Sequence, residues 1–159
     1  RSVQTTGIDG GRIANNAKGK AEKRFEKIFE DAENRKCFNC GANSREWASL
    51  PNAVFLCLVV HVIQLVVSAE CRDLKDHIVN IKSVNLDNWN EDQVKFLRLG
   101  GNTRLKAYFE RFKLGGMPFT EQVCTVACIY YRKKVKITCI GVAQAEMDGL
   151  EIEPEPSYE

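Results

Sequence analysis

The sequence predicts a small α+β domain, in which a zinc knuckle and a short three-stranded sheet are wrapped by about five helices. One observation is a pair of cysteines two residues apart, Cys37 and Cys40, followed by Cys57. A second is the presence of short strand-like segments in residues 47–57 and 78–84. The third is a series of helical patterns with caps on both sides of these strands. A chain of 159 residues is long enough for one such domain with tails.

The chain begins with mostly small and polar residues, and we expect residues 1–19 to form a disordered leader. From Lys20 onward, apolar residues recur at helical spacing, with lysines and glutamates between them. The apolar members are Ala21, Phe25, Ile28, Phe29 and Ala32. This pattern predicts an amphipathic helix that leads the chain to Cys37.

The strands are predicted on either side of a long apolar stretch. Residues 47–57, "WASLPNAVFLC", favour two short strands around a Pro-Asn turn, and "IVNIKSV" at 78–84 favours a third. The apolar stretch at 53–67 has 15 residues and includes His61 and Gln64. A bilayer span needs roughly 20 apolar residues. We therefore interpret the stretch as a buried strand that continues into another buried element.

Local signals place the first helix after the strands at residues 91–99, "EDQVKFLRL". Asn90 is placed to cap it, and Gln93 completes a capping box. Gly100 and Gly101 then end this helix.

Two more helices follow. Asn102 can start the helix "TRLKAYFERFK" at 103–113, and Thr120 can start "EQVCTVACIYYRKKVK" at 121–136. In the predicted helix at 103–113, one face is apolar and consists of Leu105, Tyr108, Phe109 and Phe112. The final residues are acidic and contain proline, so we expect a solvated tail at 141–159 after a domain at 20–140.

The net charge of +2 argues against a partner that is recognised through a basic surface, such as nucleic acid or an acidic membrane. The one basic aromatic patch, "YYRKKVK" at 130–136, is explained by lysines near a helix C-terminus. Seven cysteines, an odd number, together with the C-x-x-C pair, indicate thiolates in a reducing compartment. No secretory signal leads the sequence, and we expect a cytoplasmic protein.

The cysteine spacing C-x2-C-x16-C predicts one structural Zn²⁺, because thiolates bind zinc tetrahedrally and a tight turn supplies two of them. His61 and Cys71 are equal candidates for the fourth ligand, and His77 is a third. The alternative is that Cys57 is a buried strand cysteine and that no metal binds. Cys124 and Cys128, one helical turn apart, are interpreted as small buried residues.

Several motifs, taken in order, resemble the ArfGAP family of GTPase-activating domains for Arf-type small G proteins. They are "CFNCGANSREWASL", "VFLC", "CRDLKDHIVNIKSVNLDNW", "LRLGGN" and "YYRKKVK", and the resemblance covers about residues 20–137. One region departs from the family pattern. Removing seven residues, such as 60–66, would restore the interval between the second cysteine pair and the arginine. Val67 then stands where the family has its fourth cysteine, and Cys71 where it has a histidine.

The resemblance implies that Arg72 is the catalytic arginine, supplied in trans to a GTP-bound Arf protein. It also implies that Trp47 packs over the metal loop, with contact to the G protein as the lesser alternative. Ile81 and Lys82 lie where the family's strand faces its partner. We expect a monomer that stimulates GTP hydrolysis in vesicle traffic, at most peripherally associated with Golgi or vesicle membranes.

Two other functions compete with this hypothesis. The displaced arginine and missing cysteine favour a degenerate module of the same fold that binds partners without activating a GTPase. An unrelated zinc ribbon that binds nucleic acid would need a basic face studded with aromatic residues. The sequence contains no G-x4-G-K-[ST] loop, so no nucleotide site of its own is expected.

Overall fold

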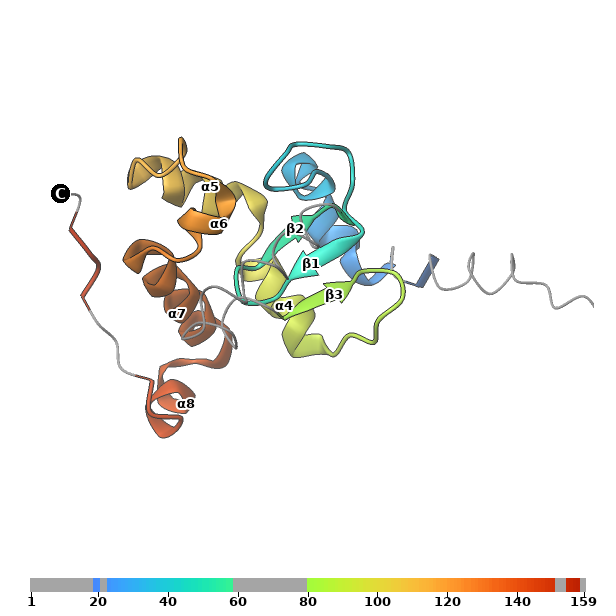
Figure 1. Ribbon diagram of the computed structural model, residues 1–159. Coiled ribbons are helices and arrows are strands. Elements are labelled where there is room, and N and C mark those ends of the chain that lie inside the picture. The colour runs from blue at the N-terminus through green and yellow to red at the C-terminus, as the bar shows by residue number, and fades with distance from the viewer. Residues whose placement is uncertain (1–18, 21–22, 59–79, 151–153, 158–159) are drawn as a thin grey trace, which may run out of the picture.

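The computed structural model describes residues 19–20, 23–58, 80–150 and 154–157 (Figure 1). Residues 23–29 are helical. The other elements are η1 (Ala32–Arg35), β1 (Trp47–Ser49), β2 (Val54–Leu56), β3 (Ile81–Ser83), α4 (Glu91–Leu99), α5 (Asn102–Arg111), α6 (Phe119–Gln122), α7 (Val126–Ile140) and α8 (Val142–Met147). In Figure 1 the sheet lies to the right and α5, α6 and α7 lie to the left. The predicted α+β class is confirmed.

The three strands form one antiparallel sheet in the order β2-β1-β3. Trp47 in the central strand pairs with Leu56 on one side and with Ser83 on the other. All three predicted strands are therefore present. The turn between β1 and β2 is tight, and Ala53 has a positive φ of 52°.

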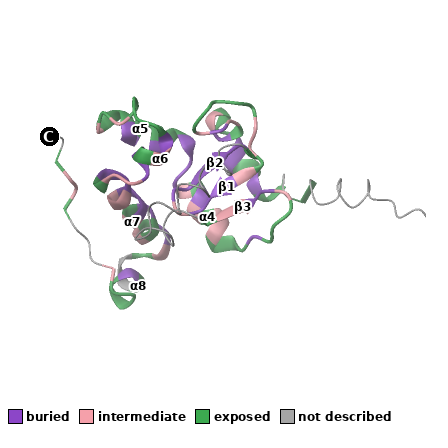
Figure 2. Ribbon diagram, in the orientation of Figure 1, coloured by how far each residue is buried: buried purple, intermediate pink, exposed green. Residues whose placement is uncertain are grey.

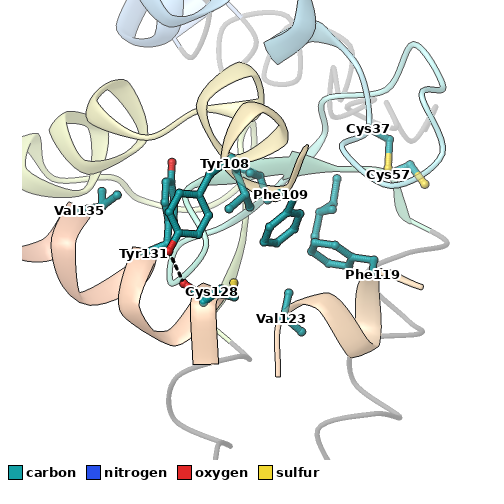
Figure 3. Close-up of a cluster of buried hydrophobic side chains, with 13 residues drawn as sticks. Cys37, Cys57, Tyr108, Phe109, Phe119, Val123, Cys128, Tyr131 and Val135 are labelled. Atoms are coloured by element: carbon teal, nitrogen blue, oxygen red, sulfur yellow. Dashed lines mark hydrogen bonds between the residues drawn. The ribbon is translucent and has the colours of Figure 1, made fainter. Parts of the chain in front are cut away.

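The sheet separates two clusters of buried apolar side chains, because successive residues of a strand point to opposite faces. Val54 and Leu56 belong to the first core, whereas Ala48 and Phe55 belong to the second core. Figure 2 shows this buried interior in purple. The first core (Figure 3) comprises Cys37, Val54, Leu56, Cys57, Leu105, Tyr108, Phe109, Phe119, Val123, Ala127, Cys128, Tyr131 and Val135. The second core comprises Phe25, Ile28, Phe29, Ala48, Leu50, Ala53, Phe55, Val84, Trp89 and Leu97.

The N-terminal helix packs in the second core. Phe25, Ile28 and Phe29 are buried as predicted, and the Phe25 ring meets the Trp89 ring edge-on at 5.1 Å between centroids. Ala32 is exposed and lies in η1, and Ala21 lies outside the described residues. The amphipathic helix is thus confirmed over its central turns.

Helix α5 and helix α7 pack in the first core. The Tyr108 hydroxyl donates a hydrogen bond to the Ala127 carbonyl oxygen at 2.9 Å, drawn as a dashed line in Figure 3. The rings of Tyr108 and Tyr131 lie 4.9 Å apart between centroids. Burial raises the pKa of Tyr131 to about 12, as expected for a phenol in an apolar setting.

Helix α4 has the predicted bounds and the predicted capping box between Asn90 and Gln93. Gly100 ends it by donating its N–H to the Phe96 carbonyl oxygen at 3.0 Å. A methyl group on Gly100 would lie 2.3 Å from the Cβ of Ala53, so glycine is required here for close approach to the β1–β2 turn.

The predicted cap of α5 is wrong. Gly101, with a φ of 93°, is the N-cap residue, and the Asn102 side chain makes no capping hydrogen bond. That side chain turns into the protein instead and is 3% exposed. The Asn102 side chain forms hydrogen bonds with buried backbone groups, described below, and not with the N-terminus of α5.

The helix predicted at 121–136 is two helices. α6 ends at Gln122, and α7 begins after Thr125, whose hydroxyl oxygen accepts from the Cys128 N–H at 3.2 Å. Threonine competes with the helical backbone for hydrogen bonds, which favours a new N-terminus over helix continuation. α7 then extends to Ile140, and α8 lies within the segment expected as a tail.

Several predictions fall outside the described residues. They concern the leader, apart from Gly19, and most of the apolar stretch, from residue 59 to residue 67. Among the residues that are described, no helix combines the length and apolar character needed to span a membrane.

Candidate metal centre

The first two cysteines lie in a tight loop between η1 and β1. The Cys37 N–H donates to the Ala42 carbonyl oxygen at 2.8 Å, and the Gly41 N–H donates to the Cys37 carbonyl oxygen at 2.9 Å. Gly41 has a φ of 72°, a conformation that favours glycine. This loop folds Cys40 back beside Cys37.

The loop is attached to the sheet next to the third cysteine. The Phe38 N–H donates to the Phe55 carbonyl oxygen at 2.8 Å, so the loop runs alongside β2. Cys57 follows directly after β2. The Phe38 ring contacts Phe109 and Phe119, with centroids 5.8 and 5.5 Å away, which fixes the loop on the first core.

The three sulfur atoms form a compact group. Those of Cys37, Cys40 and Cys57 all lie within 4.8 Å of one another, and the Cys40 and Cys57 sulfurs are 3.8 Å apart. Tetrahedral zinc with Zn–S bonds of about 2.3 Å requires S–S separations of about 3.8 Å. The Cys40–Cys57 separation equals this value, and all three sulfurs are close enough together to bind one metal ion. Figure 3 shows Cys37 and Cys57 together at the edge of the first core.

Backbone donors surround the Cys37 sulfur, but burial has the larger effect on its pKa. Burial raises the pKa of its thiol to about 11, whereas backbone N–H groups of Cys40, Cys57 and Asn39 lower it. The amide donors offset part of the cost of burying a thiolate, the form that binds a metal, and the net shift favours the neutral thiol when no metal is bound. Among the described residues, this is the one group of three or more metal-ligating side chains, so the alternative of an isolated Cys57 is not supported.

Two buried asparagines hold this loop in place. Asn102 accepts from the Phe55 N–H and donates to the carbonyl oxygens of Glu33 and Lys36, each at 2.8 Å. Asn34 accepts from the Asn102 N–H at 2.8 Å and donates to the Ile28 carbonyl oxygen at 2.8 Å. Together they join the N-terminal helix, the loop before Cys37, strand β2 and helix α5.

The sequence does not reveal the structural role of this pair. Asn34 and Asn102 are 68 residues apart, and no local motif connects them. The local sequence, in which Asn102 follows two glycines, indicates a helix cap and not a buried hydrogen-bonding residue.

The predicted partner-binding residues lie in the sheet. Trp47 and Ile81 are half-buried and pack against the first core. Lys82 donates to the Asn88 carbonyl oxygen and, at 3.1 Å, to the Gln93 side chain, and its ammonium lies 4.9 Å from the Trp89 ring centroid. Lys82 is thus engaged within the chain, where it ties β3 to the start of α4.

The remaining predicted site residues lie outside the described residues. They are His61, Cys71, Arg72 and His77. The structure brings together Cys37, Cys40 and Cys57 and leaves the fourth ligand and the arginine as predictions.

The family comparison covers most of the chain. Residues 22–135 match the ArfGap family model, described as "Putative GTPase activating protein for Arf". The mouse ADP-ribosylation factor GTPase-activating protein 3 is 30% identical over 113 residues, which are 70% of this chain and 20% of that protein. The Arabidopsis thaliana protein AGD12, also named an ADP-ribosylation factor GTPase-activating protein, is 32% identical over 95 residues, 59% of this chain and 26% of that protein.

A solved structure has the same fold. The crystal structure of a "putative GTPase activating protein for ADP ribosylation factor" from Cryptosporidium parvum superposes with a TM-score of 0.59 at 24% identity. It covers 86% of this chain and 99% of that one. The matched region, the paired cysteines on their sheet and the shared fold lead to one conclusion: the chain belongs to the ArfGap family.

Proposed function

We propose that this domain stimulates GTP hydrolysis on an Arf-type small G protein by supplying Arg72 in trans. The observation that carries the proposal is the family match over residues 22–135, and the three-sulfur cluster at the expected place supports it. The relatives named above are GTPase-activating proteins for ADP-ribosylation factor. In this proposal the domain acts on the GTP that its partner binds.

The chemistry needs an arginine. Negative charge develops on the phosphate oxygens as GTP is hydrolysed, and a small G protein alone neutralises it poorly. A guanidinium supplied by a partner offers a planar, permanently charged donor fork, and such an arginine accelerates hydrolysis roughly 10³–10⁵-fold. Lysine has a compact point charge without this planar fork, so it does not match two phosphate oxygens in the same bidentate geometry.

The role of zinc in this function is structural. Cys37, Cys40 and Cys57 would hold it, with His61 or Cys71 proposed as the fourth ligand. When bound, the metal fixes the loop of Cys37 to the end of β2, from which the chain continues toward Arg72. Because the three ligands come from two separate segments, the metal would fix the position of the loop relative to the sheet.

The partner surface is proposed to include Trp47, Ile81 and Lys82 on the sheet. Of these, Lys82 already has intramolecular partners, so its contribution would be to shape the surface between β3 and α4. We propose a monomer acting in the cytoplasm, peripheral to Golgi or vesicle membranes.

The test is single-turnover hydrolysis of GTP bound to an Arf protein. The intact chain should accelerate it, and Arg72→Lys should lose at least about 100-fold of that acceleration. Arg98→Lys is the matched control, because Arg98 is an exposed arginine in the last turn of α4 and should change nothing. Equal rates with the intact chain and Arg72→Lys would contradict the assignment of Arg72.

A second candidate is an interaction module without GTPase activation. It is favoured by the seven residues, 60–66, that separate Cys57 from the arginine segment beyond the family interval. A folded sample that binds GTP-loaded Arf without accelerating hydrolysis would establish it and exclude the first function.

Zinc content and ligand identity are tested separately. Elemental analysis should find one zinc per chain. The C-x3-H spacing from Cys57 predicts that His61→Ala weakens metal retention more than Cys71→Ala does. The reverse order would assign Cys71 as the fourth ligand.

A further inference from the structure

Cys40 differs from the other described cysteines in its exposure. Of the six cysteines in the described part of the chain, Cys40 alone is exposed, whereas Cys124 is half-buried and the other four are buried. The residues on both sides of Cys40, at 39 and 41–43, are exposed as well. Oxidation of a cysteine requires access to its sulfur and the thiolate form, and binding to a metal supplies the thiolate. Cys40 is therefore the member of the metal cluster that a dissolved oxidant reaches most readily.

Cys57 is in place to react with an oxidised Cys40. Its sulfur lies 3.8 Å from the Cys40 sulfur. A disulfide bond is about 2.05 Å long, so the two sulfurs have to approach each other by about 2 Å. Cys57 is buried at the end of β2, and the movement falls to the exposed loop that carries Cys40.

Cys37 is the rival partner, because it also lies next to Cys40. It is 2% exposed, and its sulfur accepts hydrogen bonds from the backbone N–H groups of Asn39, Cys40 and Cys57. Hydrogen bonds to a thiolate stabilise its charge, and a stabilised thiolate attacks a second sulfur more slowly. We therefore expect Cys40 and Cys57 to react with each other while Cys37 keeps its place.

The loop is attached to the sheet by contacts that involve no sulfur atom. The Phe38 N–H donates to the Phe55 carbonyl oxygen at 2.8 Å, and the Phe38 ring packs on the first core. These contacts hold Cys40 near Cys57 at a high effective concentration. An oxidised Cys40 is thus expected to meet Cys57 before it meets a second molecule of oxidant, so a disulfide is favoured over irreversible oxidation.

We propose that Cys40 is a site of reversible oxidation by peroxides, which converts the zinc-binding cluster into a Cys40–Cys57 disulfide. The Cys40 thiolate attacks one oxygen of hydrogen peroxide, the O–O bond breaks, and a sulfenic acid and a hydroxide form. The Cys57 thiolate then attacks the Cys40 sulfur, and the S–O bond breaks with loss of a second hydroxide. The two sulfurs together lose two electrons, which reduce the peroxide, and two protons convert the hydroxides to water.

The disulfide removes two of the three clustered thiolates from the metal site. Cys37 and one further ligand are too few to retain a structural zinc, so oxidation releases the metal. The disulfide meanwhile keeps the loop joined to the end of β2, and its reduction restores both ligands. The cluster then acts as a switch between a zinc-bound and a disulfide-bound form of the domain.

The experiment treats the zinc-loaded chain with hydrogen peroxide and follows zinc release with a chromogenic chelator. We expect one zinc to be released for each disulfide formed. Peptide mapping, after alkylation of the remaining thiols, should locate the disulfide between Cys40 and Cys57. Zinc retention in a tenfold excess of peroxide overturns the proposal. A disulfide of Cys40 with Cys37 or Cys71, or a Cys40 oxidised to the sulfinic acid, overturns it as well.

Variants test the two roles. Cys124→Ser is the matched control, because Cys124 is a half-buried cysteine outside the cluster, and it should leave the disulfide and the zinc release unchanged. In Cys57→Ser the sulfenic acid of Cys40 loses its resolving thiolate, so a 1,3-diketone should trap it at least 10-fold more than in the unsubstituted chain. Equal trapping contradicts the role of Cys57. Because this variant can fail to fold, the peptide map of the unsubstituted chain tests the assignment independently.

Reversibility is tested by reduction. Dithiothreitol and zinc, added after the peroxide is removed, should restore one zinc per chain. Failure to recover zinc in a folded sample overturns the switch. None of these measurements uses GTP hydrolysis, so their outcome is independent of the function proposed for Arg72.

Discussion

Replacement of Asn102, the buried first residue of α5, by alanine should strongly destabilise the fold. The Asn102 amide is 3% exposed and satisfies three backbone groups. Glu33 retains another hydrogen bond to its carbonyl, from the Lys36 N–H at 3.2 Å. The Phe55 N–H and the Lys36 carbonyl lose the partner that Asn102 provides. Each buried polar group left unsatisfied costs about 1–3 kcal/mol, so we expect a loss of about 3 kcal/mol.

The measurement is chemical denaturation of the zinc-loaded chain. Asn102→Asp should be at least as harmful as alanine, because it retains an acceptor for the Phe55 N–H but places a charged oxygen against two carbonyl oxygens. Asn90→Ala removes one exposed cap contact and should cost about 1 kcal/mol, which makes it the control. A loss below about 1 kcal/mol for Asn102→Ala, with aspartate equally tolerated, would refute the reasoning.

The same substitution should also weaken the metal centre. Asn102 holds Lys36, which precedes Cys37, and Phe55, which lies two residues before Cys57. Zinc should therefore transfer faster to a chromogenic chelator from Asn102→Ala than from Asn90→Ala. Identical transfer rates would show that the asparagine pair stabilises the fold without positioning the cysteines.

Three further changes test other features. Gly100→Ala should cost about 2 kcal/mol by overpacking against the Ala53 methyl group, and at least half of that loss should be recovered in an Ala53→Gly background; additive effects in denaturation would contradict the contact. Thr125→Ala removes the cap of α7 and should cost about 1 kcal/mol, and an unchanged denaturation midpoint would show that the break between α6 and α7 needs no cap. Cys40→Ser should abolish stoichiometric zinc and lower the melting temperature to that of the chelator-treated chain, and retained zinc would exclude Cys40 as a ligand.

Features specified by neighbouring residues could be predicted from the sequence. The bounds of α4 follow from the capping box of Asn90 and Gln93 and from Gly100, all within one short segment. The pairing of Cys37 with Cys40 follows from a tight turn. Cys57 could be added because its distance along the chain is typical of zinc sites.

Features that depend on distant contacts could not be predicted. Asn102 has the sequence context of a cap, but buried backbone groups 47 to 69 residues away hold its side chain. Arg132 lies in a basic run that indicates a solvated helix end, yet it is buried because Asn52 and Val123 supply acceptors. In each case tertiary hydrogen bonding overrides the local preference.

The strand order has a consequence for the seven residues that we interpret as an insertion. β2 and β3 both run antiparallel to the central strand β1, so they are parallel to each other and residues 57–80 must cross from one sheet edge to the other. Such a crossover needs about a dozen residues or more. The entropy of closing a loop grows only with the logarithm of its length, so seven extra residues cost about 0.3 kcal/mol. Evolution can therefore lengthen or shorten the segment that carries Arg72 with little effect on folding, and what the domain presents to its partner can change while the sheet stays the same.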